Sequence, residues 1–210
     1  MTVKDCSRNH HHHRKRLYCH PLATLLGFIV LALFLVLVII YLILRPTKPR
    51  FILQDAAVSA FNLSAANLLT TSLQVTLSSR NPNERIGIYY DKLEVYASYH
   101  SQQITPRTVL PSSYQGHKDT TVWSLNLNGN SVPLAPYLAV ALKQERLTGT
   151  VLIKMRVEGR IRWKVSTFIS GKYHLHVNCP AYVNFGSKSN GLAMGPAINY
   201  QLIMNCHVDT

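Results

Sequence analysis

Continuous and alternating hydrophobic patterns divide the chain into two parts. Residues 22–44 read LATLLGFIVLALFLVLVIIYLIL and contain no charged side chain. As a helix rising about 1.5 Å per residue, this segment is long enough for the roughly 30 Å hydrocarbon core of a bilayer. A buried core helix would carry a polar stripe, and a cleaved signal peptide would have a shorter apolar region. The pattern therefore predicts an uncleaved transmembrane helix.

Alternation with a period of two follows later in the chain and is typical of strands with one buried face. It covers residues 73–77, 151–157 and 161–165. Gly159 and Arg160 stand between the last two runs and predict a turn. We expect these two runs to form a hairpin with one apolar face and one cationic face. The cations of that face are Lys154, Arg156, Arg162 and Lys164.

Two further alternating runs finish the chain, and each carries a cysteine on its apolar face. Residues 173–179 end at Cys179, and residues 200–208 include Cys206. Neighbouring strands would bring the two β-carbons within about 4 Å, which a disulfide requires. In an oxidising compartment two cysteines indicate one disulfide, whereas a cytosolic domain would keep two reduced core cysteines. We favour the disulfide.

The remaining pattern predicts the fold class. Turn residues separate the strands, and residues 134–146 (LAPYLAVALKQER) predict one short helix ending before Gly149. Many short strands with one helix indicate an antiparallel β-sandwich outside a single transmembrane helix. The predicted parts are a basic, His-rich tail (1–20), the transmembrane helix (21–44), a Pro-rich basic stalk leading into the domain (45–60) and the sandwich (61–210).

Charge then sets the expected topology and class of partner. The chain has 22 basic and 9 acidic residues, and 17 and 8 of these follow the apolar segment, leaving +9 there. Five cations precede the segment and three follow it closely, in Arg45, Lys48 and Arg50. Cytoplasmic flanks carry more Lys and Arg, so we expect a cytosolic amino terminus and an extracellular carboxy-terminal domain. A basic outer domain suits lipid headgroups or acidic polysaccharide, and nucleic acid is the least expected partner.

Two positions are candidates for modification. Cys19 lies next to the predicted membrane segment and is a palmitoylation candidate, with an unmodified thiol as the alternative. Asn62-Leu63-Ser64 is an N-glycosylation triplet on the side of the membrane predicted to be outside. A glycan on Asn62 would also establish the topology.

Metal and catalytic motifs are weak. The run His10–His13 with His20 has no Cys or acid at a closed-site spacing, and we interpret it as a disordered basic tail. His174 and His176 share a strand face and would need a third ligand such as His117, so an outward polar face is the simpler reading. No D-x-D, G-x-S-x-G or glycine-rich phosphate loop occurs. We therefore expect no metal, no cofactor and no enzyme activity.

The stretch NPNERIGIYYD (81–91) raises the question of whether it is a ligand-binding loop or a turn and strand. Proline supplies no ladder hydrogen bond and asparagine tolerates turn geometry, so the Asn-Pro-Asn triplet should end the preceding strand. The alternation places Ile86, Ile88 and Tyr90 in the core and Gly87 and Tyr89 outside. Gly87 would mark a bulge or a close backbone contact, and the exposed Tyr89 is a candidate contact residue.

Several blocks carry a family resemblance. They are ILRPTKPRFILQDA, FNLS, NPNERIGIYYDKLEVYASY, SYQGHKDTTVW and VEGRIRWKVSTFISGKYHLHVNCPAYVNF, followed by the cysteine-containing carboxy-terminal strand. Together they resemble the plant harpin-induced and non-race-specific disease resistance-like family, whose outer part is a late embryogenesis abundant group 2 domain. The resemblance covers almost everything from Arg45 onward. The residues that match its two main motifs are Asn81, Pro82, Asn83, Gly87, Tyr89, Tyr90 and Asp91, then Gly159, Arg160, Arg162, Trp163, Lys164 and Val165. Ser166 departs from the glycine common at that position.

The resemblance implies a plasma-membrane or plasmodesmal protein of plants that takes part in pathogen response and hypersensitive cell death, without enzyme activity. It also implies a fibronectin type III-like β-sandwich. The favoured function is an interaction module whose cationic face meets acidic cell-wall polysaccharide or a defence-signalling protein. A role in abiotic-stress protection or lipid handling is the alternative, and self-association stays open.

Overall fold

The structure is a computed structural model that describes residues 12–43, 46–185 and 203–210. The chain divides into two compact units, Met1–Arg45 and Pro46–Thr210, which are described separately. Residues 1–11 and Leu44 fall outside the described residues, and so do the side chains of Cys19 and of the histidine run.

The first unit contains one helix, α1 (His12–Ile43). It begins within the segment predicted as a disordered tail, well before residue 21. The described side chains of α1, at residues 23–39 and 41, are all exposed and mostly apolar, with Phe28 at 71% and Tyr41 at 70%. Within the part of the chain whose side chains are described, no helical window meets the length and hydropathy required of a membrane span.

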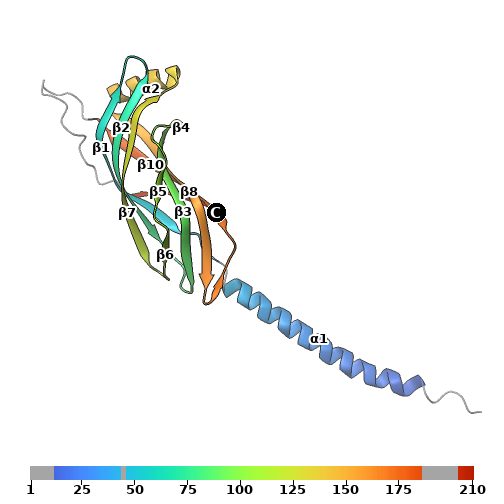
Figure 1. The fold of residues 1–210 in the computed structure, drawn as a ribbon. Coiled ribbons are helices and arrows are strands. Elements are labelled where there is room, and N and C mark those ends of the chain that lie inside the picture. The colour runs from blue at the N-terminus through green and yellow to red at the C-terminus, as the bar shows by residue number, and fades with distance from the viewer. Residues whose placement is uncertain (1–11, 44–45, 186–202) are drawn as a thin grey trace, which may run out of the picture. The chain divides into compact units, whose positions relative to one another are not determined.

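The second unit is an antiparallel sandwich of two sheets, as predicted (Figure 1). The first sheet has the order β11 (Met204–Asn205), β1 (Arg50–Leu63), β2 (Leu68–Arg80), β7 (Thr120–Pro133). The second has the order β12 (His207–Asp209), β10 (Tyr173–Asn184), β8 (Thr150–Val165), β3 (Ile86–Tyr99), β4 (Gln102–Gln103). Short strands β5 (Thr108–Leu110) and β6 (Ser113–Gln115) pair with β3, and β9 (Phe168–Ile169) pairs with β8.

Strand β1 shows where the sandwich begins. The segment 45–60, predicted as a stalk and entry into the domain, is a strand from Arg50 onward, with Phe51 and Leu53 in the core. The ladder with β2 shifts register between Leu53 and Asp55 and again between Val58 and Ala60. Each shift reverses which residues face inward, so the period of two is lost in the sequence although the strand is continuous.

Strand β8 corrects the predicted hairpin. It runs unbroken from Thr150 to Val165, and Gly159 lies in its middle rather than in a turn. The buried positions are odd-numbered on both sides of Gly159, from Val151 to Trp163. If Gly159 and Arg160 formed a turn, the two strands would not need to bury residues of the same parity. A single strand does require odd-numbered residues to stay buried throughout.

The glycine is there because β3 comes close. β3 shifts register between Tyr90 and Lys92, so Asp91 is an extra residue in the ladder. A β-carbon on Gly159 would collide with the backbone carbonyl of Lys92 and with Leu93. The absent side chain therefore lets the bulged strand approach β8.

The core lies between the sheets. Phe51 of β1 stacks against Trp123 of β7 with ring centroids 6.4 Å apart, and Tyr90 of β3 meets Trp123 edge-on at 5.7 Å. Trp163 is buried from the other sheet. Burial of each large apolar side chain contributes about 1.5 to 3 kcal/mol, so these inward faces supply most of the driving force.

The predicted helix is α2 (Pro136–Thr148), at one end of the sandwich beside the turn between β1 and β2 (Figure 1). Pro136 stands in the first turn, where its missing N–H needs no partner. Gly149 ends the helix at φ 95°, and its N–H reaches the carbonyls of Glu145 and Arg146. Leu138, Ala139 and Leu142 are the buried face.

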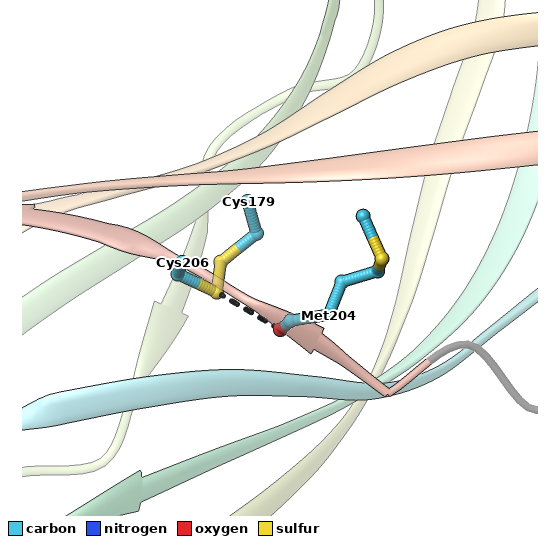
Figure 2. The surroundings of a disulfide bond; sticks show 3 residues. All are labelled: Cys179, Met204 and Cys206. Atoms are coloured by element: carbon cyan, nitrogen blue, oxygen red, sulfur yellow. Dashed lines mark hydrogen bonds between the residues drawn. A yellow bond between two sulfur atoms is a disulfide. The ribbon is translucent and has the colours of Figure 1, made fainter.

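The carboxy-terminal segment joins the two sheets. Met204 and Asn205 pair with β1 of the first sheet, whereas His207 to Asp209 pair with β10 of the second. Cys206 lies between them and forms the predicted disulfide with Cys179 of β10, with Cα atoms 4.3 Å apart. Figure 2 shows the bond beside Met204, whose carbonyl is 4.0 Å from Cys206 Sγ. The bonded sulfur has no proton to donate there, so the disulfide and the strand pairing hold the segment.

Removing the disulfide should destabilise the second unit. The bridge closes a separation of 27 residues, for which loss of unfolded-state entropy corresponds to about 3 to 4 kcal/mol. We expect Cys179→Ser and Cys206→Ser each to lower the free energy of unfolding by that amount, measured by tryptophan fluorescence in denaturant. Dithiothreitol should have the same effect on the natural chain and none on either variant. Cys19→Ser is the control, and an equal loss in it would contradict the assignment.

Gly159 offers a second test of the fold. Gly159→Ala should cost about 1 to 3 kcal/mol, because the new methyl group meets β3 backbone that has little room to move. Gly171→Ala is the matched control, since nothing lies within 4 Å of the β-carbon it would add. Thermal melts followed by circular dichroism distinguish the two, and equal melting temperatures would argue against the close approach.

Candidate functional site: the outer face of the second sheet

The four cations predicted for one face do lie on the outer side of β8. Lys154, Arg156, Arg162 and Lys164 are half-buried, and they alternate with core residues. Cross-strand neighbours complete this face: Tyr89 lies opposite Arg162, Tyr96 opposite Arg156, and His174 opposite Arg160. We call it the β8 outer face.

One end of the β8 outer face is a cluster of two tyrosines and two cations, Tyr89, Tyr114, Arg162 and Lys164, which we call the tyrosine patch. The rings of Tyr89 and Tyr114 have centroids 4.6 Å apart. Lys164 Nζ lies 5.1 Å from the centre of the Tyr114 ring and 5.7 Å from that of Tyr89. Arg162 covers the Tyr89 ring at 5.5 Å. Cations within about 6 Å of a ring face are attracted to it, so the rings fix where the charges sit.

Gly87 makes the tyrosine patch possible. It faces outward beneath the Tyr114 ring, and a β-carbon there would collide with the Tyr114 hydroxyl. Gly87 was predicted to mark either a bulge or a close backbone contact. It makes a close contact, but with the Tyr114 side chain, and the bulge of β3 lies at Asp91 instead. Tyr89 is only partly exposed, whereas Tyr114 is 44% exposed.

Asp91 neutralises one cation of the patch. Arg162 donates from Nε and Nη2 to Asp91 Oδ1, at 2.9 and 2.6 Å. The carboxylate raises the pKa of Arg162 further, so this side chain stays charged. Asp91 faces outward in the alternation of β3, and its pairing with Arg162 leaves Lys164 as the patch cation without a carboxylate among the described residues.

The middle of the β8 outer face is an ion network rather than a cationic surface. Arg107 donates to Glu94 at 3.0 Å and to Glu158 at 2.8 Å, and Lys92 pairs with Glu94 at 2.7 Å. Hydrogen bonds from Lys92 and Arg107 lower the pKa of Glu94. The Tyr96 hydroxyl and then Arg107 lower that of Glu158. Both carboxylates are thus ionised. They lie between two groups of cations, one at each end of the β8 outer face.

Lys154 and Arg156 form the second group, beyond the network. Lys154 faces Ser98 and Pro180, and Arg156 faces Tyr96 and Asn178. Neither has a carboxylate partner among the residues described. At about 3.3 Å per residue, Lys154 and Lys164 are roughly 33 Å apart along β8.

The Asn-Pro-Asn motif is structural. Asn81 is buried, and its Nδ2 donates to the carbonyls of Ile86 and Gly116 at 2.7 and 2.8 Å. Asn83 exchanges two hydrogen bonds with the backbone of Thr47, each 2.8 Å. Pro82 lies between them in the loop. The triplet therefore ends β2 and also holds the first residues of the second unit.

Two other motif residues are buried. The Tyr90 hydroxyl bonds to Ser79 at 2.8 Å and donates to Gln115 at 2.9 Å. Burial raises the pKa of Tyr90, which stays a neutral core group. Trp163 belongs to the core, whereas Arg160 is exposed beside Lys92 and His174.

The histidines form a polar row on β10. His174 and His176 stack with ring centroids 6.4 Å apart. Among the described residues, no three His, Cys, Asp or Glu side chains come together as metal ligands do. The exposed Asn62 is on β1, close to the turn that leads to β2.

Sequence reasoning missed Tyr114, Arg107 and Asp91 as members of this face. Tyr114 and Arg107 lie on or beside three-residue strands, too short to show alternation. Asp91 was a motif residue, but the sequence does not show that Arg162 is its partner on another strand. The charge partners Arg162 and Asp91, 71 positions apart, come together only through the β3–β8 register.

Comparison with known proteins identifies the family of the chain. Residues 76–180 match the family described as "Late embryogenesis abundant protein". The chain is 53% identical to NDR1/HIN1-like protein 1 of Arabidopsis thaliana, covering 98% of this chain and 99% of the relative. It is 51% identical to NDR1/HIN1-like protein 12 of the same plant, covering 100% of both.

A solved structure titled as a putative late embryogenesis abundant protein is also similar. It is 12% identical, covers 87% of this chain and 98% of its own, and has a TM-score of 0.35. The family match over residues 76–180 and the two full-length relatives show that the chain belongs to the late embryogenesis abundant family and, within it, to the NDR1/HIN1-like proteins.

Proposed function

We propose that this chain is a non-enzymatic, membrane-anchored protein of plant defence whose β-sandwich binds acidic cell-wall polysaccharide. The tyrosine patch is the observation that carries the proposal, because it places Lys164 5.1 Å from the exposed ring of Tyr114 and 5.7 Å from the partly exposed ring of Tyr89. A uronic acid offers an apolar sugar face to a tyrosine ring and a carboxylate to a neighbouring cation. The NDR1/HIN1-like resemblance supports the setting in pathogen response.

The length of the face favours a polymer over a small ligand. Two cation groups lie at either end of an ionised network, about 33 Å apart along one strand. A chain of several sugars would contact Lys164 at one end and Lys154 and Arg156 at the other. Because these groups are exposed or half-buried, each pair contributes modestly and salt weakens it.

Membrane anchoring is the second part of the proposal. α1 is a continuous helix of 32 residues, and residues 22–44 of the chain carry no charge. We place the amino terminus in the cytosol and residues 46–210 outside, at the plasma membrane and plasmodesmata. The Cys179–Cys206 disulfide supports an oxidising location for the second unit. Cys19 is then a palmitoylation site and Asn62 a glycosylation site.

Binding to polygalacturonate tests the function. We expect Lys164→Gln to weaken retention of the full chain by up to about fivefold at low ionic strength. Lys154→Gln with Arg156→Gln should weaken it further. Retention should fall as salt is raised, because the contacts are exposed. Arg162→Gln should be combined with Asp91→Asn, since the single change leaves an unpaired carboxylate.

Lys143→Gln on α2 is the control for net charge, because Lys143 is exposed and lies off the β8 outer face. An equal loss in that variant would show that overall charge, and not the face, is responsible. If the natural chain never retains polygalacturonate but extracts lipid from vesicles, the stress-protective or lipid-handling role replaces this proposal.

Topology has its own test in intact cells. External protease should degrade the second unit, and a glycosidase should increase the gel mobility of the chain unless Asn62→Gln is present. The reason is that the exposed Asn62 lies in the unit placed outside. Complete resistance of residues 46–210 to external protease would contradict the proposed orientation.

A further inference from the structure

Strand β7 forms an edge of the first sheet. It pairs with β2 on one side, and no other strand of the described residues pairs with it. Among the described residues, no backbone hydrogen bond outside the β2 ladder reaches residues 121–130. Its outer row of N–H and C=O groups is therefore available to another strand.

The usual protections of an edge strand are missing over most of β7. Thr120–Pro133 contains no charged residue, and its one proline is the last residue. The ladder is regular from Thr120 to Gly129, and an irregularity follows at Asn130 and Ser131, where Ser131 has φ 50°. Natural edges carry Lys, Pro or bulges to prevent pairing, so a regular, uncharged edge of ten residues is exceptional within this basic chain.

Charge distribution indicates which partner fits. The chain carries +13, and the β8 outer face bears many of its ions. By contrast, β7 is uncharged throughout, and β2 has one charge, Arg80 at its end. Two copies that approach through β7 avoid like-charge repulsion. Two copies that approach through the β8 outer face would bring its unpaired cations together.

The side chains of β7 also complement themselves. Val122 is 51% exposed, and Leu125, near the middle of the regular segment, is half-buried although it points to the core. An antiparallel pair centred on Leu125 sets it beside its own copy. In that register Ser124 lies opposite Asn126, and Val122 opposite Asn128. Every facing pair is uncharged, and the serine and asparagine side chains can hydrogen bond.

We propose that two copies of this chain associate through antiparallel pairing of β7 with β7, which joins their first sheets into one continuous sheet. The association is two-fold symmetric, so the same strand serves both partners. It leaves the β8 outer face of each copy uncovered, because that face belongs to the other sheet.

A charge exchange across the edge tests the pairing. In the full chain, Ser124→Lys with Asn126→Lys should convert the dimer to a monomer, and Ser124→Glu with Asn126→Glu should do the same. Mixing the two variants should restore association, since each lysine then faces a glutamate. Light scattering after size exclusion, with detergent mass subtracted, measures the molar mass over a range of concentrations.

The matched control is Gln74→Lys with Thr76→Lys. These residues lie in the same two rows of the same face, opposite Asn126 and Ser124, but on β2, where pairing is complete. This variant should remain dimeric. A natural chain that is monomeric at all concentrations would overturn the proposal. Association that persists in both charged variants would also overturn it, because the contact would then lie at α1 or elsewhere. Failure of the mixed variants to reassociate would overturn it too.

Discussion

The pairing of β3 with β8 is the contact on which both the fold and its outer face depend. Gly159 lets the β3 backbone approach, and the bulge at Asp91 forms at that point. Up to the bulge, regular alternation points Tyr90 into the core to meet Ser79 and Gln115, and it points Asp91 outward to meet Arg162. After the bulge the phase changes, so that Lys92 faces outward like Asp91 and Leu93 returns to the core. Without the extra residue, Lys92 would face the core and Leu93 the outside, because neighbouring residues alternate between faces.

The sequence predicted those features that depend on regular alternation. The sandwich class, α2 and the Cys179–Cys206 pair followed from periodicity and from cysteines on apolar faces. Predictions failed where the backbone departs from regularity. Bulges hid β1 in the supposed stalk, and a glycine required for a close approach was taken for a turn in β8. A glycine alone does not distinguish a turn from close packing, but the unbroken odd-numbered phase of β8 does.

The predicted cationic face illustrates a second limit. Alternation put Lys154, Arg156, Arg162 and Lys164 on one side of β8, but it gave no information about their partners on other strands. Asp91 pairs with Arg162, and Glu94 and Glu158 occupy the centre through Arg107. Counting cations on a strand therefore overstates its charge. What remains is local: one lysine against two neighbouring tyrosine rings, and a separate pair of cations about 26 to 33 Å away along the strand.

The two ends of the second unit are held together by interactions of different kinds. Asn83 fixes Thr47 by two hydrogen bonds, and Lys48 reaches the Val208 carbonyl at 3.4 Å and Asp209 at 3.6 Å. The exposed Lys48 contacts are weak alone. Val208 and Asp209 lie two and three residues after Cys206. The disulfide therefore restricts the conformations of the segment that Lys48 contacts. The covalent bond therefore also helps to hold the beginning of the unit.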